Sequence, residues 1–101
     1  MSQSYRNPIS KSKHDRRVAV EARSYAAREY MDEADIPGYF RPEIINGHIP
    51  DVLAQKGSYV SIVEVETAGT LNTRHALAQA RAFRRACRYN DNWHFRRVVA
   101  R

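Results

Sequence analysis

The sequence is poor in the features that define several classes of protein. Cys87 is the single cysteine among 101 residues, so no disulfide can form within the chain, and the histidines show no metal-ligand spacing. No apolar run approaches the about 18 residues that a membrane-spanning helix needs. No signal-peptide pattern is present either. We therefore expect a single-domain protein of the reducing cytoplasm with no membrane partner.

Acidic residues are scarce in the C-terminal third of the chain. From Leu71 to Arg101 there are eight arginines, no lysine and one acid, Asp91, while the whole chain carries a formal charge of +6. Arginine is the better planar partner for phosphate, so this third suits a polyanion such as nucleic acid. A solvated basic surface without such a partner is the alternative.

Glycine and proline are few, four of each, and they help to divide the chain into elements. Residues 1–12 are polar, and we expect them to form a flexible arm before a single domain over 13–101. Helices are predicted over 13–33 and 71–89, the second capped by Thr70. Strands are predicted over 39–45, 49–54, 59–66 and 94–100, with turns at Asn46-Gly47 and at Lys56-Gly57-Ser58.

This order of elements predicts a mixed α/β (α+β) fold of the pattern αβββαβ. Short hairpin turns make antiparallel neighbours, and the second helix can return the last strand to the same sheet. We expect a mixed central sheet flanked by a helix on each face.

Asp51, Glu64 and Glu66 lie near the ends of two predicted strands. Side chains alternate along a strand, so Glu64 and Glu66 share a face with Val60 and Ile62. Two carboxylates at the end of a buried strand repel each other, and a cation between them relieves the repulsion. Mg²⁺ takes few carboxylates together with water and phosphate oxygens, so the pattern favours metal-dependent phosphodiester chemistry. An acid solvated at a sheet edge and a solvent-facing row of glutamates are the alternatives.

The Pro50-Asp51 step, the sequence Glu64-Val65-Glu66 and the element order together resemble the PD-(D/E)xK nuclease superfamily, closest in pattern to archaeal Holliday junction resolvases. The resemblance covers about residues 13–100. It implies a restriction-endonuclease-like core and a metal-dependent endodeoxyribonuclease that acts on DNA as a homodimer with Mg²⁺ or Mn²⁺. It also implies that Asp51, Glu64 and the backbone carbonyl of Val65 bind the metal.

Glu66 stands where this family usually has a lysine. It could accept a proton from the attacking water or hold a second ion, but an arginine or a second metal must then supply the lysine's positive charge. The resemblance also implies a metal-proximal glutamate on the first helix, for which Glu21 fits and Glu29 competes, and a glutamine on the second helix, Gln79. Because of the departure at Glu66, a catalytically inactive relative that binds nucleic acid or a protein is the second interpretation.

Basic side chains form candidate contacts to a nucleic-acid backbone on both predicted helices. Those of the second helix fall on one helical face, and a row of this kind can contact successive phosphates. A solvated helix face is the alternative for both sets. The candidates are Arg74, Arg81, Arg85 and Arg88 on the second helix, with Lys13 and Arg17 on the first.

Overall fold

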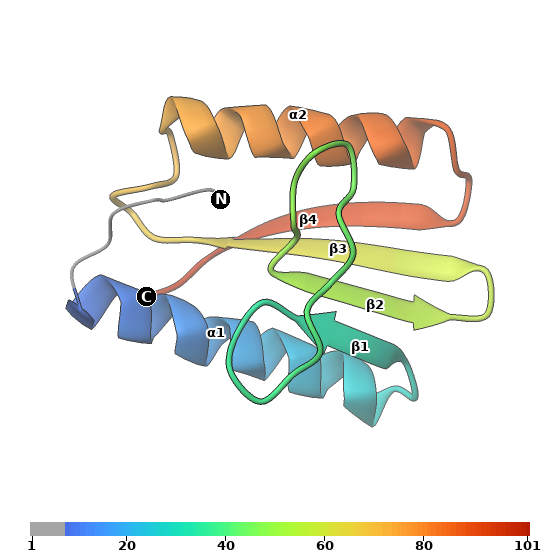
Figure 1. The fold of residues 1–101 in the computed structure, drawn as a ribbon, viewed down its shortest axis with the longest axis horizontal. Helices are drawn as coiled ribbons and strands as arrows, with labels where there is room; N and C mark the ends of the chain where they lie inside the picture. Colours follow the sequence, from blue (N-terminus) through green and yellow to red (C-terminus); the bar gives the residue numbers. More distant parts are fainter. Residues whose placement is uncertain (1–7) are drawn as a thin grey trace.

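The computed structural model describes residues 8–101 and places one four-stranded sheet between two helices (Figure 1). The strands lie in the order β1-β2-β3-β4, antiparallel except for the parallel pair β3 and β4. The predicted mixed α+β class and the element order are confirmed. The elements are α1 (Pro8–Ala27), β1 (Met31–Ala34), β2 (Val52–Lys56), β3 (Tyr59–Glu66), α2 (Arg74–Arg88) and β4 (Trp93–Val99).

Alternation along β3 gives each face of the sheet its own core. Val63 and Val65 pack on the face that α1 covers, with Val18, Ala22 and Tyr25 of that helix. Val60 and Ile62 of β3 point to the other face, which α2 covers. They belong to a second core that includes Leu53, Phe83 and Ala86. The two helices lie on opposite sides of the sheet in Figure 1. Glu64 and Glu66 follow Ile62 on the α2 face, as the alternation predicts.

Both ends of α1 differ from the prediction. The helix begins at Pro8, so residues 8–12 are helical rather than part of a flexible arm, and proline suits the first helical turn. The remainder of the expected arm, residues 1–7, lies outside the described part of the chain. At the other end Glu29 takes a left-handed conformation (φ 68°), and the Tyr30 amide bonds back to the Tyr25 carbonyl. This closure ends the helix well before residue 33.

The strand predicted over 39–45 is wrong. Residues 31–34 form β1 instead, paired with β2, and residues 35–51 form a long loop whose ends meet where the Asp35 amide donates to the Asp51 carbonyl (2.9 Å). Phe40 in this loop is 85% exposed, whereas Tyr39 is half-buried against the core on the α1 face. The Asn46-Gly47 turn is present, but it closes only an isolated bridge between Ile45 and His48. Strand propensity here was overridden by tertiary packing.

The second half of the chain follows the prediction closely. Gly57 takes a positive φ (60°) in the hairpin between β2 and β3, as the turn motif predicts. The second helix begins at Arg74 and is capped by Thr73, whose Oγ1 accepts from the Ala76 amide, so Thr70 is not the cap. The buried face of α2 is made by Ala76, Ala80, Phe83 and Ala86, and Leu77 is 39% exposed. No helix within residues 8–101 is long and apolar enough to cross a membrane.

Candidate active site

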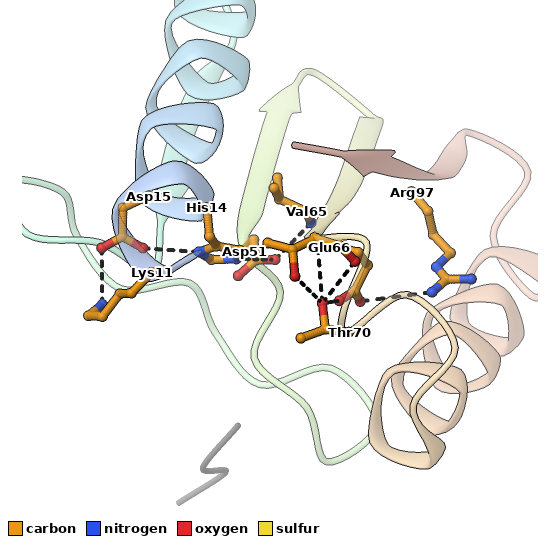
Figure 2. Close-up of polar contacts among 9 residues, drawn as sticks. Lys11, His14, Asp15, Asp51, Val65, Glu66, Thr70 and Arg97 are labelled. Carbon is orange, nitrogen blue, oxygen red and sulfur yellow. Dashed lines mark hydrogen bonds and ion pairs between the residues drawn. The ribbon is translucent and has the colours of Figure 1, made fainter. Parts of the chain in front are cut away.

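Asp51, Glu64 and Glu66 come together at the end of the sheet where β3 finishes and β2 begins. Glu64 and Glu66 are 3% and 4% exposed, and the Asp51 side chain is 16% exposed. Figure 2 shows the neighbours of this group, with His14 and Asp15 reaching in from α1 on one side and Arg97 from β4 on the other. The hairpin register brings the first residues of β2 beside the last residues of β3, which is why acids distant in sequence meet.

Asp51 is held in place by a hydrogen bond from β3 and an ion-pair contact from α1. The Val65 amide donates to Asp51 Oδ2 at 2.8 Å, and His14 Nε2 lies 3.3 Å from the same oxygen. Burial alone would raise the pKa of Asp51, but hydrogen bonds from His14 and Glu64, the charge of His14 and the Val65 amide together lower it below its usual value. Asp51 therefore loses its proton more readily than an ordinary aspartic acid.

Glu64 holds a proton more readily than Asp51. Burial, and then the charge and hydrogen bonding of Asp51 and the charge of Glu66, raise the pKa of Glu64 well above its usual value. The pKa values of the two neighbouring carboxyls are therefore shifted in opposite directions. Glu64 Oε1 is buried and finds no hydrogen-bond partner among the described residues.

Glu66 is anchored from the connection between β3 and α2. Thr70 Oγ1 donates to Glu66 Oε1 at 2.9 Å and accepts from the Thr67 amide at 3.0 Å. Arg97 Nη2 lies 4.0 Å from Glu66 Oε2 and donates to the Leu71 carbonyl. Thr70 therefore fixes an acid of the site rather than capping α2 (Figure 2).

His14 is a member of the site that the sequence analysis missed. It is 5% exposed, its Nδ1 lies 3.0 Å from Asp15 Oδ1, and Lys11 binds the other oxygen of Asp15 at 3.0 Å. As a cation, His14 would donate to Asp15 and to Asp51 at the same time. One sequence signal was available, because His14 precedes Val18 by four residues and so continues the buried stripe of α1.

Glu21 lies apart from this group. It is buried on α1, where Arg17 Nε donates to it at 2.8 Å and Arg96 of β4 donates to its other oxygen. Arg96 pairs in register with Val63, so this network occupies the α1 face of the sheet, opposite Glu64. Burial would raise the pKa of Glu21, but the two arginines lower it.

The other candidates come from the two helices. Glu29 is exposed beyond the end of α1, and Gln79 is half-buried on α2. Lys13 is half-buried, and Arg17 is engaged with Glu21. The arginine row is exposed and runs along α2 from Arg74 to Arg88, about 21 Å away at 1.5 Å per residue. Its members in order are Arg74, Arg81, Arg85 and Arg88.

The donor set suits a hard divalent cation that is only partly enclosed by protein. Within residues 8–101 no three side chains of His, Cys, Asp or Glu are grouped so that they could already hold a metal ion. The carboxyls of Asp51 and Glu64 offer oxygen ligands. Glu64 Oε1 has no hydrogen-bond partner in the described chain. Mg²⁺ is commonly bound by one or two carboxylates, with water and phosphate oxygens completing its shell, so the pair fits this ion.

The chain matches no protein-family model, no curated protein and no solved structure. The functional interpretation therefore depends on the chemistry of the site. Its two distinctive features are a pair of adjacent carboxyls whose pKa values are shifted in opposite directions and a guanidinium 4.0 Å from the third acid.

Proposed function

We propose that this protein is a metal-dependent endodeoxyribonuclease that hydrolyses DNA phosphodiester bonds with Mg²⁺ or Mn²⁺ at the Asp51–Glu64 pair. The observation that carries the proposal is the meeting of Asp51 and Glu64 at one end of the sheet, where the Val65 amide fixes Asp51 and the buried Glu64 Oε1 has no hydrogen-bond partner in the described chain. A divalent cation would occupy that oxygen and would relieve the repulsion between the carboxylates. The resemblance to PD-(D/E)xK nucleases supports the same assignment.

Asp51 and Glu64 would hold the ion through their side chains, with the Val65 carbonyl as a third ligand. When bound, the ion would lower the pKa of a water molecule and neutralise charge on the phosphate. His14 and the Val65 amide orient Asp51, since both address Oδ2. Thr70 fixes the side chain of Glu66 by donating a hydrogen bond to it.

Glu66 is the proton acceptor in this proposal. The oxygen of the attacking water forms a bond to phosphorus, the bond from phosphorus to the leaving oxygen breaks, and one proton of the water passes to Glu66. The leaving oxygen takes a proton from solvent. Gln79 lies on the helix that follows, half-buried, and we assign it no step.

DNA would be held by basic side chains around the site. The formal charge of +6 and the exposed arginine row on α2 support a polyanionic partner. A chain of this size offers little surface for DNA beyond the site, so we also propose a homodimer, for which the edge strand β4 is available as a contact. We place the protein in the cytoplasm, which suits a nuclease with one unpaired cysteine, Cys87.

A catalytically inactive DNA-binding protein is the second candidate, and the glutamate at position 66 favours it. Calorimetric titration with Mn²⁺ and nicking of supercoiled plasmid distinguish the two functions. Active protein should bind Mn²⁺ and nick plasmid, and Asp51→Asn should abolish both while leaving DNA binding intact or stronger. Asp91→Asn makes the same chemical change in an exposed turn and should alter nothing. Wild-type protein that binds DNA without Mn²⁺ binding or nicking would establish the second candidate.

A further inference from the structure

Glu64 and Arg97 are direct neighbours across the parallel pair of β3 and β4, and each carries a buried atom without a partner. They are partners in register, so their side chains emerge on the same face of the sheet. Glu64 Oε1 lacks a donor and Arg97 Nε lacks an acceptor within residues 8–101. Buried polar atoms are nearly always hydrogen-bonded, so two such atoms on adjacent residues call for an explanation.

The position of Arg97 is fixed although its Nε has no acceptor. Its Nη2 donates to the Leu71 carbonyl in the connection that leads into α2, and the same nitrogen lies 4.0 Å from Glu66 Oε2. The side chain is only 18% exposed. Figure 2 shows it extending from β4 toward Glu66. The guanidinium is therefore held beside the acids, with its Nε donor uncommitted among the described residues.

A metal ion together with a phosphate would satisfy both unpartnered atoms at once. The acceptor Glu64 Oε1 requires a cation or a proton, and the donor Arg97 Nε requires an anionic oxygen. A phosphodiester with its divalent ion brings both charges to adjacent positions. The planar guanidinium is suited to phosphate oxygens, because it can present two parallel N–H donors.

We infer that Arg97 is a catalytic residue that donates from its guanidinium to a nonbridging oxygen of the scissile phosphate, an inference that depends on the proposed nuclease function. Arg97 stays protonated throughout and transfers no proton. It stabilises the negative charge that grows on the phosphate oxygens as the bond to water forms. In this way Arg97 supplies, from a different strand, the positive charge that the resemblance expects at position 66.

Substitution of Arg97 by glutamine tests the inference, with Arg101→Gln as a control of equal charge change at an exposed position. We expect Arg97→Gln to reduce the single-turnover rate of DNA cleavage by about 100-fold or more. Its Mn²⁺ affinity should be unchanged or tighter, because a positive charge near the ion is gone. Arg101→Gln should match the wild type in both measurements.

A third variant separates a phosphate contact from a structural clamp. Arg97→Lys keeps the charge but loses the paired donors, so its rate should fall between those of the wild type and Arg97→Gln; it also carries the test if Arg97→Gln fails to fold. A structural clamp predicts instead that Arg97→Lys loses stability and cleavage together.

The possible failures are distinguishable. If the wild type cleaves DNA and Arg97→Gln cleaves equally well, the inference is overturned and the nuclease function stands. Parallel loss of Mn²⁺ binding and cleavage in folded Arg97→Gln would also overturn it, since it would assign the residue a structural role. If the wild type neither binds Mn²⁺ nor cleaves DNA, the proposed function fails and the inference fails with it.

Discussion

Thr70 Oγ1 donates a hydrogen bond to Glu66 Oε1 at 2.9 Å, while Thr73, three residues later, caps α2. Two threonines of one short connection thus have separate tasks, one in the site and one in the helix. Replacement of each by valine removes a hydroxyl with little change of shape. The two variants therefore form a matched pair.

Thr70→Val should impair DNA cleavage, because Glu66 loses its donor and the Thr67 amide loses its acceptor. Thr73→Val should leave cleavage unchanged. Both variants should lose about 1 kcal/mol of stability, from a hydrogen bond in one case and a helix cap in the other. Thermal unfolding and plasmid nicking provide the two measurements. Equal activity of the two variants would mean that Glu66 needs no positioning.

His14 should act on the metal through Asp51. Replacement of His14 by alanine removes the ring nitrogen 3.3 Å from Asp51 Oδ2, so that carboxylate loses the contact from α1 and keeps the Val65 amide. We expect Mn²⁺ affinity to fall by about 10- to 100-fold, as is typical for partners of metal ligands. His94→Ala, at an exposed position on β4, is the control. Calorimetry that gives the same affinity for both variants would exclude a positioning role.

Glu64→Gln should stabilise the metal-free protein at neutral and higher pH. The raised pKa of Glu64 means that its contribution to stability is complete below its unfolded pKa and is lost as the pH rises through the folded value. A neutral amide avoids that loss, so the variant should gain on the order of 1 kcal/mol at pH 8 and show a flatter stability profile. Denaturant unfolding at several pH values measures the effect, and exposed Glu43→Gln is the control. If the stability of the variant falls as steeply with pH as that of the wild type, the raised pKa of Glu64 is contradicted.

Glu21→Gln should behave in the opposite way. Because the folded pKa of Glu21 is lowered, its contribution to stability is present above its unfolded pKa and is lost as the pH falls through the folded value. The variant should be less stable than the wild type by about 1–3 kcal/mol at pH 7, and the difference should shrink in acid. Exposed Glu29→Gln should have no such effect. Mn²⁺ affinity should stay unchanged in both variants, and a weaker affinity in Glu21→Gln alone would make Glu21 a metal ligand after all.

The arginine row on α2 makes a prediction about salt. If Arg81, Arg85 and Arg88 contact phosphates, each replacement by alanine should flatten the plot of log affinity against log salt by about 0.9 units, since one fewer counterion is released. Helix stability should hardly change, because the row is exposed and alanine is the better helix former. Fluorescence anisotropy over a range of salt concentrations measures the slopes. Unchanged slopes in all three variants would identify the row as a solvated face.

Local patterns predicted the parts of the site that depend on one strand or one turn. Alternation along β3 placed Glu64 and Glu66 on one face, and the Gly57 turn brought Asp51 back beside them. Thr70 was assigned to the wrong task because Thr73 is an equally good cap, and sequence alone does not rank two threonines three residues apart.

Contacts between distant elements could not be predicted in the same way. His14 contacts Asp51 because α1 packs across the sheet with its first turns beside the start of β2. Arg97 lies near Glu66 because of the parallel register of β3 and β4. The strand predicted over 39–45 failed for a related reason: strand propensity describes a half-buried surface, and this segment stays largely on the outside.

The parallel pairing of β3 with β4 also affects the order in which the residues of the site can come together during folding. The β2–β3 hairpin needs only a two-residue turn, whereas β4 must wait for α2 and the closure of a much longer loop. The carboxylate pair can therefore assemble early in folding, and Arg97 arrives with the slower crossover. If the protein is the nuclease proposed above, a chain with the hairpin formed and the crossover still open would have the carboxylate pair without the arginine.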